Sequence, residues 1–291
     1  MKYVSYILFA GILWGIISIF LHGLELIGFS TFQCVALRLF FATLFLLIVI
    51  LVKDKKLLKF RLRDLPLFIG MGLGCLGSSV FYLWDISLCG SSAVPALLLD
   101  TSPIFVLILS SVFLNEKITP LKIAALVLTI VGVLLVTGVF SSGNSVSFVS
   151  ILIGLLSGIS YAVYSIINKK AIIKYDSLTI TFYAFFTATI VFVPFSGIFA
   201  NVTLIFNSSS ILYILGLSLI STVIPFLLYS LGLKGLPASK VSILANTELL
   251  VASIVGILYF GEDFSLLKIV GFILVVCAIV LLNLKPKPHK N

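Results

Sequence analysis

Apolar runs of about 20 residues, separated by short polar breaks, follow one another along almost the whole chain. A bilayer core of roughly 30 Å is crossed by an α-helix of that length. The runs lack the alternation of barrel strands, and open sheet edges cannot face hydrocarbon, so the pattern predicts helices. We therefore expect an all-α integral membrane protein with ten transmembrane helices, near residues 4–23, 31–52, 66–88, 91–113, 120–140, 147–167, 178–200, 210–233, 237–260 and 266–284.

The composition and the placement of the basic residues support this interpretation. The chain is 61% hydrophobic and 10% charged, whereas a soluble domain carries roughly 25% charged residues. With ten spans, 17 of the 19 Lys and Arg residues fall on one side of the membrane, Lys268 falls on the other, and Arg38 lies within a span. Basic loops stay in the cytoplasm, so we expect a protein of the cell membrane with both termini cytoplasmic. The basic excess thus indicates topology and a lipid partner rather than a nucleic-acid partner.

The chain also repeats itself after about half its length. FLNEKITPLKI at 113–123 resembles YFGEDFSLLKI at 259–269, and Gly11-x-x-x-Gly15 has a counterpart in Gly154-x-x-x-Gly158. Each copy would hold five spans, and an odd number places the second copy upside down in the membrane. We expect a first repeat at 1–140, an external connecting loop at 141–146, an inverted second repeat at 147–284, and a basic cytoplasmic tail at 285–291. Inverted repeats recur in secondary transporters, with the binding site near the midplane.

These features resemble the EamA-type transporters of the drug/metabolite transporter superfamily. The resemblance rests on the two sets of five spans, the P-x(12)-E spacing from Pro103 to Glu116, the E-x-apolar-[ST] turns at Glu116 and Glu262, and Arg38 in the second span. It implies a carrier or exporter with a central cavity lined by spans one, three, four, six, eight and nine. The family's second copy commonly reads Glu-Pro where this chain has Glu248-Leu249, so the resemblance implies a straighter ninth helix here.

Few ionisable residues lie within the predicted spans. Asp100 and Glu248 lie roughly 13 Å deep, counted at 1.5 Å per helical residue. Such groups are costly in a bilayer unless they are paired or hydrated, so they are candidates for substrate binding or proton coupling. The alternative is a structural ion pair of either carboxylate with Arg38. Asp85, near the external end of the third span, is expected to lie at a solvated helix end, with a cation-attracting mouth as the alternative.

Aromatic and amide side chains complete the predicted substrate site. Trp14, Tyr82, Tyr161 and Tyr229 fall on spans that the resemblance places around the cavity. Aromatic walls suit small amphipathic solutes, although most aromatics in such a chain face lipid or pack against other helices. Asn246 could donate a hydrogen bond to a substrate or satisfy backbone groups near a helix break.

The two acidic turns are candidates for gating elements. Each Glu should end its helix, a hydroxyl three residues on should cap the next helix, and a Lys six residues on should fold back toward the Glu. These trios are Glu116, Thr119 and Lys122 in the first copy, and Glu262, Ser265 and Lys268 in the second. A folding role without gating is the alternative.

Together these observations predict a secondary transporter, an exporter or exchanger of a small metabolite such as an amino acid or amine, that works by alternating access. A nucleotide-like metabolite or a drug is the alternative substrate. A membrane-embedded lipid-modifying enzyme is disfavoured, because its chemistry needs clustered His, Asp or Cys, and His22 and His289 lie at the outer rim and in the tail. No cofactor or metal is expected, and the sequence leaves a homodimer open.

Overall fold

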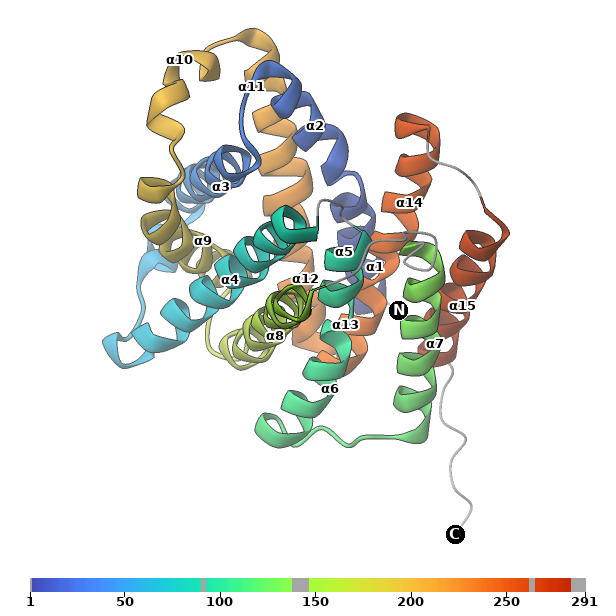
Figure 1. The fold of residues 1–291 in the computed structure, drawn as a ribbon. Helices are drawn as coiled ribbons and strands as arrows, with labels where there is room; N and C mark the ends of the chain where they lie inside the picture. Colours follow the sequence, from blue (N-terminus) through green and yellow to red (C-terminus); the bar gives the residue numbers. More distant parts are fainter. Residues whose placement is uncertain (1, 90–92, 138–146, 262–264, 284–291) are drawn as a thin grey trace.

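The structure, a computed structural model, describes residues 2–89, 93–137, 147–261 and 265–283, and its regular elements there are all helical (Figure 1). Ten helical segments of this described part are long and apolar enough to cross a membrane, which confirms the predicted number. The protein is therefore an all-α, multi-pass membrane protein. Its elements in the first half are α1 (Lys2–Gly15), α2 (Ile17–Ile27), α3 (Thr31–Lys53), η1 (Lys55–Leu58), η2 (Leu62–Asp64), α4 (Leu65–Cys89), α5 (Ala93–Asp100), α6 (Ser102–Phe113) and α7 (Pro120–Thr137).

The second half also consists of long helices joined by short ones. They are α8 (Phe148–Ala171), α9 (Ser177–Phe192), η4 (Val193–Phe195), η5 (Ile198–Asn201), α10 (Val202–Ile205), α11 (Ser208–Leu215), the π-helical η6 (Gly216–Val223), α12 (Ile224–Gly235), α13 (Ala238–Ala245), α14 (Thr247–Phe260) and α15 (Leu266–Asn283). The seventh span is shorter than the predicted 178–200. Its α-helix ends before Pro194, which lacks a backbone N–H, and Gly197 follows in the left-handed region at φ 71°.

Local sequence explains several helix ends. Ser30 and Gln33 form a capping box at the start of α3, and Asp176 caps α9 with its side chain. Gly28 ends α2 at φ 113°, a left-handed conformation that glycine adopts without strain. These caps confine the polar backbone groups of the helix ends to the turns between spans.

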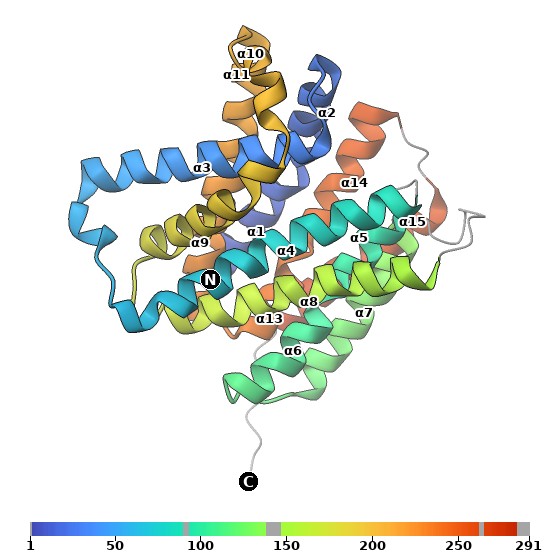
Figure 2. The ribbon, with the colours of Figure 1, turned by 60° about the vertical axis from the view of Figure 1, so that its left-hand side comes forward.

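Helices of the first half pack mainly against helices of the second half. α4 lies along α8 (Figure 2). α1 packs against α12. When the spans are numbered in chain order, the first contact joins spans three and six and the second joins spans one and eight, so exchanging the halves turns one contact into the other. α7 and α15, the last spans of the two halves, also lie side by side (Figure 1).

The contact between α3 and α9 repeats this pattern at the level of single residues. The Thr43 and Thr189 hydroxyls, 146 residues apart in the chain, are hydrogen-bonded at 2.9 Å. The same separation relates the two Glu phrases of the sequence. A residue that meets its own counterpart in this way would lie on the axis relating two similar halves.

Polar side chains lie inside this bundle and large apolar ones lie outside. Ser165, Asn168 and Ser230 are completely buried, whereas Leu258 and Val52 are more than four-fifths exposed, at 81% and 83%. In a bilayer such exposed leucine and valine side chains contact lipid tails at no cost. The interior of the bundle is thus the place where polar chemistry can occur.

Candidate functional site

The helices that carry Asp100 and Glu248 are both interrupted beside these residues. α5 ends at Asp100 and α6 begins after Thr101, while α13 ends before Asn246 and α14 begins after it. The ninth span is therefore interrupted at Asn246 without a proline, and a straighter helix than in other family members stays a prediction. Interrupted helices at membrane depth are typical of transporter binding sites, since they leave backbone groups available to a solute.

Two glycine pairs allow neighbouring helices to approach these interruptions closely. A Cβ added at Gly11 would lie 3.0 Å from the backbone nitrogen of Glu248, and one added at Gly15 would lie 2.8 Å from its carbonyl oxygen. On the other side, a Cβ at Gly158 would lie 3.2 Å from the carbonyl oxygen of Leu98. These short approaches at both glycine motifs hold α1 and α8 against the backbone beside both carboxylates.

Arg38 shares an electrostatic environment with Glu248 but does not form an ion pair with it. In the described residues, ion pairs within 4.0 Å join Lys122 to Glu116 and Lys174 to Asp64, and neither includes Arg38. Arg38 and Glu248 nevertheless interact electrostatically. The buried Nε of Arg38 has no hydrogen-bond partner among the described residues. The interior therefore holds an arginine with an unsatisfied donor close to a carboxylate.

Asp100 belongs to the same neighbourhood. It interacts electrostatically with Glu248, and Tyr82 interacts with both carboxylates and with Asp85. The buried Nδ2 of Asn246, at the interruption beside Glu248, also lacks a hydrogen-bond partner in the described part of the chain. Two unsatisfied donors and two carboxylates therefore lie on helices that meet in the bundle interior. A buried polar group without a partner is costly, so these two donors require an explanation that the described side chains do not supply.

Aromatic rings form a wall beside these charges. The Trp14 ring lies 5.2 Å from that of Phe226 and 5.5 Å from that of Tyr229, and the Tyr161 ring lies 5.9 Å from Tyr229. The Arg38 guanidinium lies 5.8 Å from the centre of the Phe226 ring, within the range of cation–π attraction. The structure thus brings Trp14, Tyr161 and Tyr229 together, with Trp14 and Tyr229 almost fully buried.

The tyrosines of this wall belong to a polar network that was not predicted from the sequence. Tyr229 shares a 2.7 Å hydrogen bond with Ser165, and the Asn168 amide donates to Tyr164 and to Ser230 at 2.9 Å each. These bonds join α8 to α12 and hold the tyrosines in place. Asn168 was the available clue, because an amide in an apolar span needs partners.

Asp85 does not lie at a solvated helix end. Its exposed fraction is 0%, and its Oδ1 accepts a hydrogen bond from the Ser150 hydroxyl of α8. Gly154 makes room for it, since a Cβ there would lie 2.5 Å from Asp85 Oδ2. The expectation of a solvated Asp85 is therefore wrong, and the residue joins α4 to α8.

The turn at Glu116 makes a contact that its sequence did not reveal. The backbone N–H of Ala238 donates to Glu116 Oε1 at 2.5 Å, and the Ser239 hydroxyl donates to Oε2 at 2.6 Å. Glu116 therefore holds the N-terminus of α13, where a carboxylate is favoured by the helix dipole. Burial raises the pKa of Glu116, but these hydrogen bonds together with Lys122 outweigh burial and leave the pKa below its ordinary value.

The predicted geometry within the acidic turns is partly confirmed. Lys122 folds back to Glu116 at 3.4 Å, and the Thr119 hydroxyl accepts from the Lys122 backbone N–H at 3.3 Å. The corresponding Ser265 hydroxyl accepts from the Lys268 N–H, also at 3.3 Å. Glu262 lies outside the described residues.

These features define a polytopic helical membrane protein with charged and aromatic groups gathered between its two halves. The EamA-like transporter family matches residues 1–138 and again residues 148–284, so the chain belongs to this family. It is 29% identical over 279 residues to an uncharacterized transporter of Archaeoglobus fulgidus, covering 94% of each chain.

Two further relatives have names that specify a solute. A probable terminal-alkyne amino-acid exporter of Streptantibioticus cattleyicolor is 26% identical, with 77% of this chain and 74% of the relative aligned. An S-adenosylmethionine uptake transporter of Rickettsia bellii is 26% identical, with 80% and 76% aligned. A protein of known crystal structure shares the fold at a TM-score of 0.79 and 15% identity, covering 97% of this chain and 96% of its own.

Proposed function

We propose that this member of the EamA-like family is a secondary transporter, an exporter or exchanger, for solutes that carry both an amino group and a carboxylate. The proposal rests on one observation above the others. Arg38, with an unsatisfied buried Nε, shares the interior of the bundle with Asp100 and Glu248 without pairing to either within 4.0 Å in the described residues. A zwitterion would supply a carboxylate to Arg38 and an amino group to Asp100 and Glu248.

The two ends of such a solute would be bound by different groups. The guanidinium of Arg38 presents a planar fork that matches a carboxylate, with the Asn246 amide as a second donor. Asp100 and Glu248 would accept hydrogen bonds from the amino group. Either carboxylate could release a proton when the amino group binds. Trp14 and Tyr229 would contact the apolar part of the solute through the aromatic wall.

The relatives support this class of solute. One bears the name of an amino-acid exporter and another that of a transporter for S-adenosylmethionine, a methionine derivative. Because one name specifies export and the other uptake, the direction of transport follows from neither. Nucleotide-like metabolites and drugs that lack the amino-acid group are the competing solutes in the test below.

The transport cycle would use the two halves as the moving parts. We propose that they are inverted repeats, which the exchange symmetry of the helix contacts and the Thr43–Thr189 hydrogen bond support. The contact of Glu116 with Ala238 and Ser239 would close one face of the site and would break when that face opens. In alternating access, this contact would form while the opposite face opens. It would break while the opposite face closes.

Counterflow in proteoliposomes tests the proposal. Vesicles containing the purified protein are loaded with an unlabelled amino acid and exposed to the labelled one, for each of an aromatic, an aliphatic and a basic amino acid. The matching amine and the matching carboxylic acid serve as controls that carry one charged group each. We expect counterflow of at least one amino acid that exceeds that of both of its analogues. Exchange of nucleosides or cationic drugs, with none of any amino acid, would contradict the proposal.

A further inference from the structure

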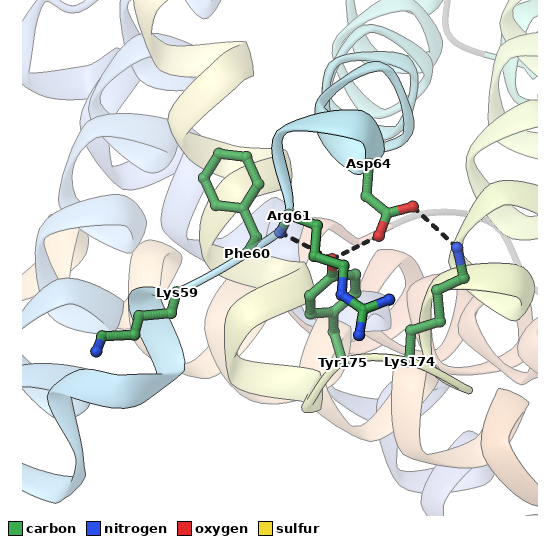
Figure 3. A pocket seen from close by; sticks show the side chains of 6 residues that line it. All are labelled: Lys59, Phe60, Arg61, Asp64, Lys174 and Tyr175. Atoms are coloured by element: carbon green, nitrogen blue, oxygen red, sulfur yellow. Dashed lines mark hydrogen bonds and ion pairs between the residues drawn. The ribbon is translucent and has the colours of Figure 1, made fainter.

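A basic pocket lies where the segment between α3 and α4 meets the turn between α8 and α9. It has a volume of about 480 Å³ and is lined by Lys59, Phe60, Arg61, Asp64, Lys174 and Tyr175 (Figure 3). Its residues come from both halves of the chain, and they lie at helix ends, on the side of the membrane that carries most of the basic residues. None of them belongs to the candidate transport site.

The pocket is held in shape by hydrogen bonds that leave part of its charge free. Asp64 is paired with Lys174 at 2.9 Å and accepts a hydrogen bond from Tyr175 at 2.7 Å, and the Tyr175 hydroxyl in turn accepts from the Arg61 backbone at 3.2 Å. The one carboxylate of the pocket is therefore already neutralised. Among the described residues, the side chains of Arg61 and Lys59 have no ion-pair partner, so the lining keeps a net positive charge.

Aromatic packing and two hydrogen bonds from α9 fix the walls of the pocket. The Phe60 ring lies 4.8 Å from that of Tyr183 and 5.3 Å from that of Phe68. The Tyr183 and Thr179 hydroxyls donate to the carbonyl oxygens of Leu58 and Leu57, both at 2.7 Å. The basic side chains thus project from an ordered segment rather than from a free loop.

Exposed apolar residues adjoin two of the pocket's lining residues in the chain. Leu62, next to Arg61, is 80% exposed, and Ile173, next to Lys174, is 81% exposed. At the end of a membrane span, such side chains contact acyl chains. The pocket therefore offers cations to an anionic headgroup, and these neighbouring apolar residues would contact the tails of the same molecule.

We propose that this pocket binds the phosphate-bearing headgroup of an anionic phospholipid. Arginine and lysine are the side chains that bind phosphate, and basic pockets at this level of membrane proteins take lipid headgroups. The volume lies within the roughly 300–1,000 Å³ of small-molecule sites and exceeds what a phosphate ion fills, which favours a headgroup over inorganic phosphate. Because the lining joins the two halves, a bound lipid also stabilises their contact.

Lipid titration of the full-length protein in detergent tests this proposal. Short-chain phosphatidylglycerol, short-chain phosphatidylcholine and inorganic phosphate are titrated separately, and binding is followed by native mass spectrometry. The test variant is Lys59→Gln with Arg61→Gln. The control is Lys55→Gln with Lys56→Gln, which removes the same charge from exposed residues of the same segment outside the pocket. Arg61→Gln alone is a milder variant, since it removes one of the two pocket charges that are unpaired in the described chain.

We expect phosphatidylglycerol to bind tightly to the wild type and to the control, and phosphatidylcholine to bind weakly to both. The test variant should lose about tenfold or more in affinity for phosphatidylglycerol, as when a hydrogen bond to a charged group is removed. Arg61→Gln should show a smaller loss in the same direction. Equal losses in the test and control variants would reduce the effect to general surface charge and overturn the proposal. Inorganic phosphate binding as tightly as the lipid would overturn the assignment to a lipid.

Discussion

Replacing Gly15 by alanine should displace the carboxylate of Glu248 without unfolding the protein. The added Cβ would lie 2.5 Å from Val251 Cβ and 2.8 Å from the Glu248 carbonyl oxygen. Ordinary contact begins at 3.4 Å, so the first distance is about 0.9 Å too short. Both obstacles are backbone or branch-point atoms that cannot rotate away, and α14 must therefore move relative to α1.

This movement should reduce transport much more than it reduces stability. Overpacking of this kind costs about 1–3 kcal/mol, against a typical stability of about 5–15 kcal/mol, so the variant should fold. A binding site, however, tolerates only about 0.5 Å of displacement. We expect the rate of amino-acid counterflow to fall about tenfold or more, while the midpoint temperature of unfolding falls by only about 2–10 °C.

Gly70→Ala is the matched control for this variant. Its added Cβ would meet only the terminal Cδ1 of Ile167, at 2.9 Å, and that methyl group can rotate away. The control should therefore transport at nearly the wild-type rate. If Gly15→Ala transports as fast as the wild type, or if both variants lose the same activity, the glycine pair does not position the site.

Three further predictions concern the closed face, the aromatic wall and the topology. Glu116→Gln should lower the unfolding temperature at pH 7. The difference should shrink as the pH falls from 4.5 through the lowered pKa of Glu116, because the contribution of this carboxylate is complete above 4.5 and is lost as it gains a proton in the folded protein. A difference independent of pH would contradict this. In a Trp84→Phe variant, the fluorescence of Trp14 should change when a transported amino acid is added, and an unchanged spectrum would place Trp14 away from the solute. Single cysteines at Asn207 and Lys56, in a variant without native cysteines, should react with an impermeant reagent in intact cells at position 207 only; the opposite result would invert the topology.

The number of spans and the family could be predicted because they depend on properties that are local in the sequence. Apolar runs of membrane length and the placement of basic residues need no knowledge of packing. The Gly11-x-x-x-Gly15 motif is likewise local in the sequence, and its missing side chains permit the close approach of α1 to the backbone at Glu248.

Contacts between distant segments could not be predicted in this way. The sequence located Glu116 at a turn but gave no sign that its carboxylate reaches the start of α13, 122 residues away in the chain. Asp85 was expected at a solvated end because its position along the helix does not reveal that Ser150 and Gly154 cover it. The sequence allowed a helix break near Asn246 but did not show that α1 approaches this backbone, where a Cβ at Gly11 would lie 3.1 Å from the Ala245 carbonyl oxygen.

The selectivity of the Arg38→Gln variant tests whether Arg38 binds the solute. If Arg38 binds the carboxylate of a zwitterion, the variant should lose most counterflow of the amino acid and keep most transport of the matching amine, which has no carboxylate. Arg63→Gln, the same change at an exposed residue outside the bundle interior, should leave both unchanged. Equal losses for amino acid and amine in Arg38→Gln, or transport of the amino acid at the wild-type rate, would contradict a carboxylate-binding role for Arg38.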